Sequence, residues 1–185
     1  MNVDLYVFKL INSLAEKDPF LDQFFILLTD FSPIIIALVF GWIWFFKKGD
    51  KWENRKLIIF AGIVFVLAVG INYFINALYF RPRPFVDGAF TLLIDKAADS
   101  PSFPSNHATG AFAAAFAIIS KDRKLGWGLM ILAALIGISR IFVGVHYPTD
   151  ILAGAAIAFI AFFIVQTIMN FIKPRDQRRK RSRGY

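Results

Sequence analysis

The sequence predicts an all-α fold: one membrane domain over residues 1–185, built as a polytopic bundle of five to six transmembrane helices. Of the 185 residues, 57% are hydrophobic and 17% aromatic, while only 18% are charged, less than the roughly one quarter that is typical of soluble domains. Apolar runs recur along the chain, and basic residues gather between them. This composition argues against a disordered chain, and the zero cysteine count excludes disulfides and thiolate–zinc sites.

Three apolar runs reach the length of about 20 residues that a membrane-spanning helix requires. They cover residues 57–80, 125–145 and 149–172. A fourth run, 105–120, is shorter but rich in Ala and Gly. Because small residues let helix backbones approach closely in a membrane, we expect this run to lie inside the bundle. Residues 34–46 supply a fifth apolar run.

The N-terminal region, residues 1–31, is amphipathic at first and then apolar. Asp18-Pro19 and Ser32-Pro33 each have the pattern of a helix start, an N-cap followed by Pro at the first helical position. This region either lies at the membrane interface or forms a sixth crossing. No basic leader precedes it, so we expect no removable signal peptide. The apolar face of its first part, at helical spacing, comprises Val3, Val7, Leu10, Ile11 and Leu14.

Basic residues indicate how the runs are oriented. Segments 47–56, 121–124 and 173–185 contain five, three and seven Lys and Arg, which is 15 of the 21 in the chain. If each run crosses once, these three segments lie on one side, and the positive-inside rule makes that side cytoplasmic. The net charge of +8 is also compatible with nucleic-acid binding by the tail. A juxtamembrane basic run is more typical of an anchor to anionic lipid, so we expect a bilayer partner and no nucleic acid.

Polar residues on the opposite side are few and concentrated at three corners, residues 81–84, 104–107 and 139–150. Both histidines of the chain lie in these corners. An Arg near the end of a span commonly snorkels to the interface, and a single His beside Pro is usually structural. Because ionisable groups at membrane depth are costly and these all fall on one side, the pattern favours a functional site.

The residue types at these corners suit phosphate chemistry. Arg83 and Arg140 can bind phosphate oxygens with paired donors. Segment 105–107 lies at a helix start, where free backbone N–H groups and the helix dipole favour an anion. Asp150 could hold one ring nitrogen of His146 and leave the other as a nucleophile. The remaining histidine, at 107, could then protonate a leaving oxygen.

These corners resemble the signature of the type-2 phosphatidic acid phosphatase superfamily, the integral-membrane lipid phosphatases. Its three blocks are Lys-x6-Arg-Pro, Pro-Ser-Gly-His and Ser-Arg-x5-His-x3-Asp. Here the third block, 139–150, is complete, the second has Asn106 in place of Gly, and the first has Asn76 in place of Lys before Arg83-Pro84. The resemblance covers residues 57 to 155. It is closer to the bacitracin-resistance type of undecaprenyl diphosphate phosphatase, which shares both departures, on segments 71–73, 79–80, 82–85, 97–99, 103–105 and 139–141.

The resemblance implies a role for each motif residue. His146 would be the nucleophile that forms a phosphohistidine, Asp150 would orient it, and His107 would be the general acid and later activate water. Arg81 would partly replace the missing Lys. No metal and no cofactor would be needed. The residues that would hold the phosphate are Arg83, Arg140, Ser105, Asn106, Asn76, Arg81 and Ser139.

The same resemblance implies a lipid substrate. Undecaprenyl diphosphate is favoured, giving the monophosphate carrier and inorganic phosphate at the outer face of the bacterial plasma membrane, a step in recycling the lipid carrier of peptidoglycan synthesis. Phosphatidylglycerophosphate and phosphatidic acid are alternative substrates, because the motifs bind phosphate and not the tail. A non-catalytic transporter, with Arg and His lining an ion path, is a third hypothesis, although it would not need this spacing. The sequence leaves the oligomeric state open.

Overall fold

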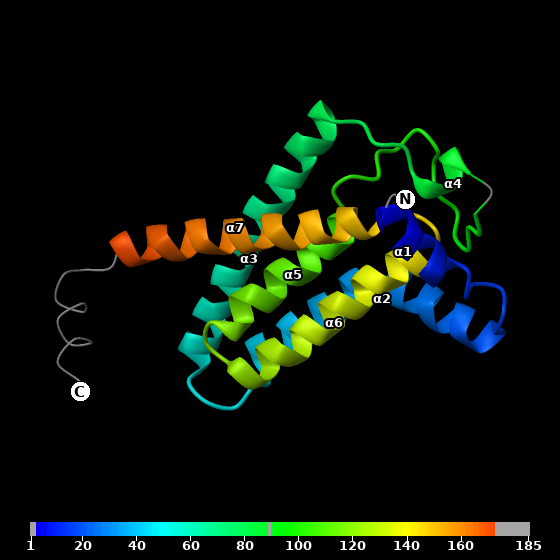
Figure 1. Ribbon diagram of the computed structural model, residues 1–185. Helices are drawn as coiled ribbons and strands as arrows, with labels where there is room; N and C mark the ends of the chain where they lie inside the picture. The colour runs from blue at the N-terminus through cyan, green and yellow to red at the C-terminus, as the bar shows by residue number, and fades with distance from the viewer. Residues whose placement is uncertain (1–2, 89, 173–185) are drawn as a thin grey trace.

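The computed structural model describes residues 3–88 and 90–172, and the regular structure in that part of the chain is entirely helical (Figure 1). The helices are α1 (Val3–Asn12), α2 (Pro19–Phe45), α3 (Lys51–Leu78), α4 (Pro84–Asp87), α5 (Asn106–Ile119), α6 (Arg123–Phe142) and α7 (Pro148–Ile172).

Each of the five predicted apolar runs lies in its own helix. Four of these helices, α2, α3, α6 and α7, are long and apolar enough to cross a membrane. α5 has 14 residues and is about 21 Å long at 1.5 Å per residue, which is shorter than the hydrocarbon core. α1, with 10 residues, is too short for the sixth crossing that the N-terminal region could have supplied.

The prediction that a helix begins at Ser32-Pro33 is wrong, because α2 continues through Pro33. Proline cannot donate a hydrogen bond to the carbonyl four residues earlier, which is that of Thr29. The hydroxyl of Ser32 donates to this carbonyl at 3.0 Å instead, so the helix continues without an unpaired acceptor. The other predicted start is confirmed: Asp18 caps α2 by accepting from the backbone N–H groups of its first turn.

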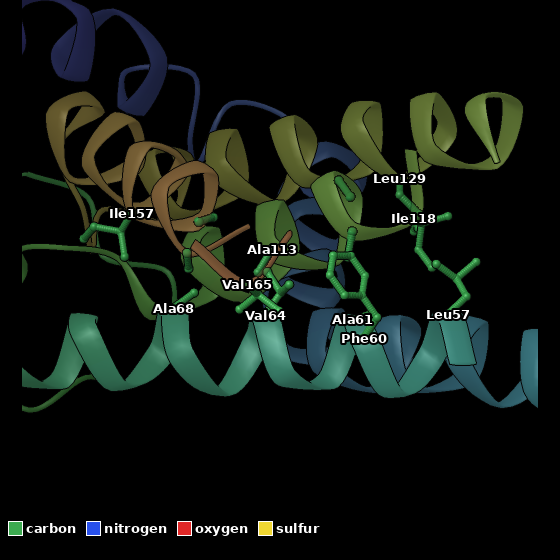
Figure 2. Close-up of a cluster of buried hydrophobic side chains, with 14 of the residues drawn as sticks. Leu57, Phe60, Ala61, Val64, Ala68, Ala113, Ile118, Leu129, Ile157 and Val165 are labelled. Carbon is green, nitrogen blue, oxygen red and sulfur yellow. The ribbon is translucent and has the colours of Figure 1, made fainter. Parts of the chain in front are cut away.

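The short helix α5 lies at the centre of the bundle, as its Ala-rich sequence predicts. Most of its residues are buried against α3, α6 and α7. Figure 2 shows the apolar face of α3 directed at this centre. Gly154 of α7 makes the close approach to α5 possible, because a Cβ there would lie 2.8 Å from Oγ1 of Thr109. The core residues labelled in Figure 2 are Leu57, Phe60, Ala61, Val64, Ala68, Ala113, Ile118, Leu129, Ile157 and Val165.

The two described basic segments meet at one end of the bundle. Nζ of Lys47, in the α2–α3 connection, forms a 3.0 Å ion pair with Oδ2 of Asp122, in the α5–α6 connection. The three polar corners lie at the other end, where α3, α5 and α6 meet the start of α7 (Figure 1). The predicted cytoplasmic tail, 173–185, lies outside the described residues.

Candidate active site

The C-terminus of α6 explains the five-residue spacing between Arg140 and His146. Gly144 has a φ of +88°, in the left-handed region that favours glycine. The N–H of Val145 donates to the carbonyl of Arg140 at 3.1 Å, and that of Gly144 donates to the carbonyl of Ile141 at 3.1 Å. This is a Schellman motif. It ends the helix and turns the chain, so that the N–H of His146 also reaches the carbonyl of Arg140, at 3.3 Å.

The imidazole of His146 is buried between an acceptor and a donor. Its Nδ1 lies 3.4 Å from Oδ2 of Asp150, and its Nε2 lies 3.4 Å from Nη1 of Arg83. A carboxylate accepts and a guanidinium donates, so these neighbours favour the tautomer with the proton on Nδ1 and a lone pair on Nε2. Burial is the main cause that lowers the pKa of His146 to about 4; Arg140 and Arg83 add to it, and Asp150 opposes it. The ring is therefore neutral at neutral pH, as a nucleophile must be.

Arg83 fastens two loops to each other beside this ring. Its Nη1 donates to the carbonyl of Val145 at 2.9 Å. Its Nε and Nη2 donate to the carbonyls of Ser100 and Pro101, at 3.1 and 2.9 Å. Burial lowers the pKa of Arg83, with Asp150 opposing. The side chain therefore holds the 100–101 loop against the turn that carries His146.

Asp150 is fully buried and held from two sides. Its Oδ1 accepts from Nη1 of Arg81 at 2.6 Å, and its Oδ2 accepts from the backbone N–H of Tyr147 at 2.8 Å. Its carbonyl accepts from the N–H of Ser105 at 3.2 Å, which joins the start of α7 to the start of α5. These contacts leave Oδ2 directed at His146.

Arg140 differs from Arg83 in that no group of the described residues hydrogen-bonds to its side chain; the charge of Asp30 acts on it without a direct contact. It is 3% exposed, and among the residues that the structure describes its side chain makes neither a hydrogen bond nor an ion pair; its Nε is buried without a partner. A buried charge without a partner is strongly unfavourable, so this guanidinium is suited to receive an anion. Oδ1 of Asn76, the residue in the first motif block, is likewise buried without a partner in the described chain.

The start of α5 contributes the second motif block. Ser105 is the N-cap, and its Oγ accepts from the backbone N–H of Ala108. Asn72 of α3 donates to the side chain of Asn106 and to the carbonyl of Pro104. The ring of His107 makes no hydrogen bond within the described part of the chain, while the charges of Arg140, Lys96 and Arg83 act on it together with His146. The start of α5 is thus bonded to α3, and its histidine lies within the range of the three cations.

Lys96 is a candidate site residue that sequence reasoning missed. Its side chain is exposed and has no ion-pair partner in the residues that the structure describes. Desolvation and the positive charges of Arg83 and Arg140 lower its pKa, so it belongs to the same group of cations. No signature motif contains it, and its position in a loop gives no periodic signal.

Two predicted phosphate ligands are engaged elsewhere. Arg81 extends to Asp4, Thr149 and Asp150. Ser139 is fully buried, donates to the carbonyl of Ile136 at 2.7 Å, and accepts from Oγ1 of Thr29 at 2.8 Å, which joins α6 to α2. Sequence reasoning placed both with the phosphate, Ser139 as part of the third motif block and Arg81 as a partial replacement for the missing Lys. In the structure their contacts join elements of the scaffold.

The N-terminal helix supplies contacts that the sequence did not reveal. Asn12 donates to the carbonyls of Thr91 and Phe142, both at 2.9 Å, and accepts from the N–H of Thr91 at 3.2 Å. It therefore fastens the end of α1 to the end of α6. Asp4, at the start of the same helix, bonds to Thr149 and Arg81. Neither residue belongs to a recognisable motif.

An apolar groove leads away from the start of α5. It has a volume of about 490 Å³ and lies between α2, α3, α5 and α6. His107 and Asn106 form its polar part, and the exposed side chains of Phe65, Val66 and Tyr73 border it. The other lining residues are Ser32, Pro33, Ile36, Ala37, Phe40, Gly62, Val69, Gly110, Ala111 and Ile136.

A membrane-embedded helical bundle with a cationic His–Asp site at one end defines the class of integral-membrane phosphatases. The family model of the PAP2 superfamily matches residues 57–174. The chain belongs to this superfamily.

Two curated relatives and one solved structure place the chain within it. The chain is 39% identical to undecaprenyl-diphosphatase BcrC of Bacillus subtilis over 168 residues, which cover 91% of this chain and 85% of that protein. It is 28% identical to phosphatidylglycerophosphatase B of the same organism, over 76% of this chain and 68% of that protein. The crystal structure of Aquifex aeolicus LpxE has the same fold, with a TM-score of 0.77 at 24% identity over 90% of this chain and 96% of that one.

Proposed function

We propose that this protein is a lipid diphosphate phosphatase, with undecaprenyl diphosphate as its substrate and undecaprenyl phosphate and inorganic phosphate as its products. The observation that carries the proposal is the buried, unpartnered guanidinium of Arg140. Its charge and that of Arg83 act on a neutral histidine whose Nε2 faces Arg83 and not its carboxylate partner. The charge of Lys96 acts on both arginines. The 39% identity to an undecaprenyl-diphosphatase supports this substrate.

The geometry suggests two steps. Nε2 of His146 attacks the terminal phosphorus, a P–N bond forms, and the P–O bond to the remaining lipid phosphate breaks. His107, protonated when the anionic phosphate is bound beside it, gives that proton to the leaving oxygen. In the second step His107 takes a proton from water, the water oxygen bonds to phosphorus, and the P–N bond breaks to release phosphate and neutral His146. Asp150 stabilises the positive charge that develops on the imidazole in both steps.

Three cations compensate the phosphate charge in this scheme. Arg140 has unused donors, and Arg83 lies against the attacking nitrogen. We assign to Lys96 the part that the missing motif Lys would have, in place of Arg81, whose Nη1 and Nη2 already donate to Asp4, Thr149 and Asp150. Asn76 and the N-terminus of α5 at Ser105 and Asn106 complete the binding set. Ser139 is assigned to the scaffold.

The groove supports a lipid substrate. Its walls are almost wholly apolar, and its polar end is formed by His107 and Asn106. A phosphate bound near His107 would therefore be able to leave its hydrocarbon tail in the groove, between α2 and α3, where the tail can continue into the bilayer. An apolar tail gains about 0.8 kcal/mol for each methylene removed from water.

The distribution of charge supports one orientation. The basic segments 47–56 and 121–124 lie at the end of the bundle opposite the candidate site, so the positive-inside rule favours a site outside the plasma membrane. The zero cysteine count makes a direct test possible. Single cysteines at Ala98 and at Lys121, treated with a membrane-impermeant maleimide on intact cells, should label at Ala98 only. Labelling at Lys121 alone would reverse the orientation.

The activity is tested with the purified protein in detergent. It should release phosphate from undecaprenyl diphosphate in the presence of EDTA, and His146→Ala should abolish release. With substrate labelled in its terminal phosphate, the wild-type protein should acquire an acid-labile, alkali-stable label. Full activity of His146→Ala would overturn the mechanism, and solute flux in liposomes without phosphate release would overturn the enzymatic function.

Phosphatidylglycerophosphate is a second candidate substrate, since a relative at 28% identity is named for it and the groove selects an apolar tail without specifying its type. Initial rates on the two lipids, measured side by side in the same micelles, decide between them. A higher kcat/KM for the glycerophospholipid would replace the proposed substrate while retaining the chemistry.

A further inference from the structure

Helix α1 joins the catalytic machinery through one carboxylate. The helix lies beside the junction of α6 and α7 (Figure 1), and Asp4 is in its first turn. Oδ2 of Asp4 accepts from Nη2 of Arg81 at 2.6 Å. The same guanidinium donates through Nη1 to Oδ1 of Asp150, also at 2.6 Å. One arginine thus joins a carboxylate of the N-terminal helix to the carboxylate that faces His146.

Thr149, in the first turn of α7, bonds to both Asp4 and Arg81. The backbone N–H of Thr149 donates to Oδ1 of Asp4 at 2.9 Å, and its hydroxyl donates to Oδ2 at 2.6 Å. The Thr149 hydroxyl also accepts from Nη1 of Arg81 at 2.7 Å. Asp4 therefore caps the first turn of α7 from outside that helix, where a carboxylate satisfies a free N–H and interacts favourably with the helix dipole.

The neighbours of Arg81 fix the position of its guanidinium and keep it positively charged. Its guanidinium lies 4.0 Å from the ring centroid of Tyr147, the residue whose N–H holds Oδ2 of Asp150. Burial would raise the pKa of Asp4, but the hydrogen bonds of Thr149 and Arg81 outweigh it and the pKa is lowered. Burial likewise would lower the pKa of Arg81, but Asp4 and Asp150 raise it. One cation is thus shared between two carboxylates.

We propose that Asp4 is a positioning residue for catalysis: it holds Arg81 and the first turn of α7 so that Oδ1 of Asp150 is occupied and Oδ2 faces Nδ1 of His146. Without Asp4, Arg81 has a single carboxylate partner, and it can rotate toward Asp150 and engage both oxygens. This would withdraw Asp150 from the imidazole and slow the attack on phosphorus. The inference rests on the proposed function, because it acts through the proposed nucleophile.

The test compares Asp4→Asn with the wild-type protein in phosphate release from undecaprenyl diphosphate. A misplacement of about 1 Å by a residue away from the chemistry can cost up to about 100-fold. We therefore expect kcat to fall roughly 10-fold, with KM within about twofold because the groove and the phosphate ligands are untouched. The double variant Asp4→Asn/Arg81→Ala should lose no more activity than Arg81→Ala alone, since the two residues act in series.

Asn12→Ala is the matched control, because Asn12 also fastens α1 but has no contact with Arg81. It should lower the unfolding temperature at least as much as Asp4→Asn and leave kcat within about twofold. The proposal is overturned if Asp4→Asn keeps full kcat, if its effect falls on KM, if the two losses multiply in the double variant, or if Asn12→Ala lowers kcat equally. Activity of His146→Ala would instead refute the proposed function itself.

Discussion

Nη1 of Arg83 lies 3.4 Å from Nε2 of His146, the nitrogen that faces away from Asp150. The same Nη1 donates to the carbonyl of Val145, so the guanidinium is anchored to the turn that carries the histidine. A phosphate placed over Nε2 would meet this cation without any rearrangement of the protein.

Replacing either arginine should abolish activity, with opposite effects on stability. Arg140→Met should lower kcat/KM at least 100-fold, as loss of a transition-state donor does, while the unfolding free energy is unchanged or rises by about 1–3 kcal/mol, because an unpartnered buried charge is removed. Arg83→Met should be equally inactive but less stable by about 3 kcal/mol, since three loop carbonyls lose their donor.

Phosphate release and denaturant unfolding in the same detergent measure both quantities for this pair of arginines. A loss of stability in Arg140→Met equal to that in Arg83→Met would mean that Arg140 has a structural partner in the protein, and would remove the main support for its phosphate role.

The pH dependence of kcat/KM should show a rising limb centred near pH 4. His146 attacks only as the neutral base, and burial together with Arg140 and Arg83 lowers its pKa to about 4. Above that pH the nucleophile is neutral; as the pH falls through 4 it is protonated and activity is lost, tenfold for each further unit. A limb centred near 6.5, the ordinary value for histidine, would mean that the ring is solvated in the free enzyme.

Lys96→Met should lower kcat/KM roughly 10-fold, because one cation near the phosphate is lost. Lys96→Glu should lower it further, and the effect of both should decrease at high salt, since the side chain is exposed. Lys121→Met, at the opposite end of the bundle, is the matched control and should have wild-type kinetics. Equal activity of Lys96→Glu and the wild-type protein would exclude Lys96 from the site.

A larger side chain in the groove should weaken binding of long-chain substrates and leave short-chain substrates unaffected. Gly62 borders the groove, and a Cβ there has open space around it, so Gly62→Leu should project into the groove without distorting α3. We expect KM for a long-chain lipid diphosphate to rise roughly 10-fold, because apolar contact with several methylenes is lost, while a short-chain analogue is hydrolysed at the wild-type rate.

Gly128→Leu is the control for the groove variant. A Cβ at Gly128 also has open space, but this glycine lies on α6 and is not among the lining residues. Kinetics for Gly62→Leu that match those of Gly128→Leu on both substrates would place the tail elsewhere.

Much of the architecture was predictable because membrane helices carry long apolar runs. The five runs fall in five helices, and the buried helix α5 was identified by its small residues. Pro33 was misinterpreted because the rule that proline starts a helix takes no account of Ser32, whose hydroxyl replaces the missing backbone donor. Residues 3–12 form a helix with the predicted apolar face, but their contacts with the site depend on a single carboxylate that no pattern distinguishes.

By itself, the sequence determined the family, the order of the three motif blocks, and the identity of His146, His107 and Asp150 as candidates. Residue type and spacing are sufficient for this, because the turn after α6 and the start of α5 are each formed by residues that lie close together in the sequence. Tertiary structure alone decided which cations are available. Arg81 and Arg140 were both predicted to hold the phosphate, yet Arg81 donates to Asp4, 77 residues away, while the Nε of Arg140 is buried without a hydrogen-bond partner among the described residues. Charge availability depends on three-dimensional neighbours, and these are not encoded by local spacing.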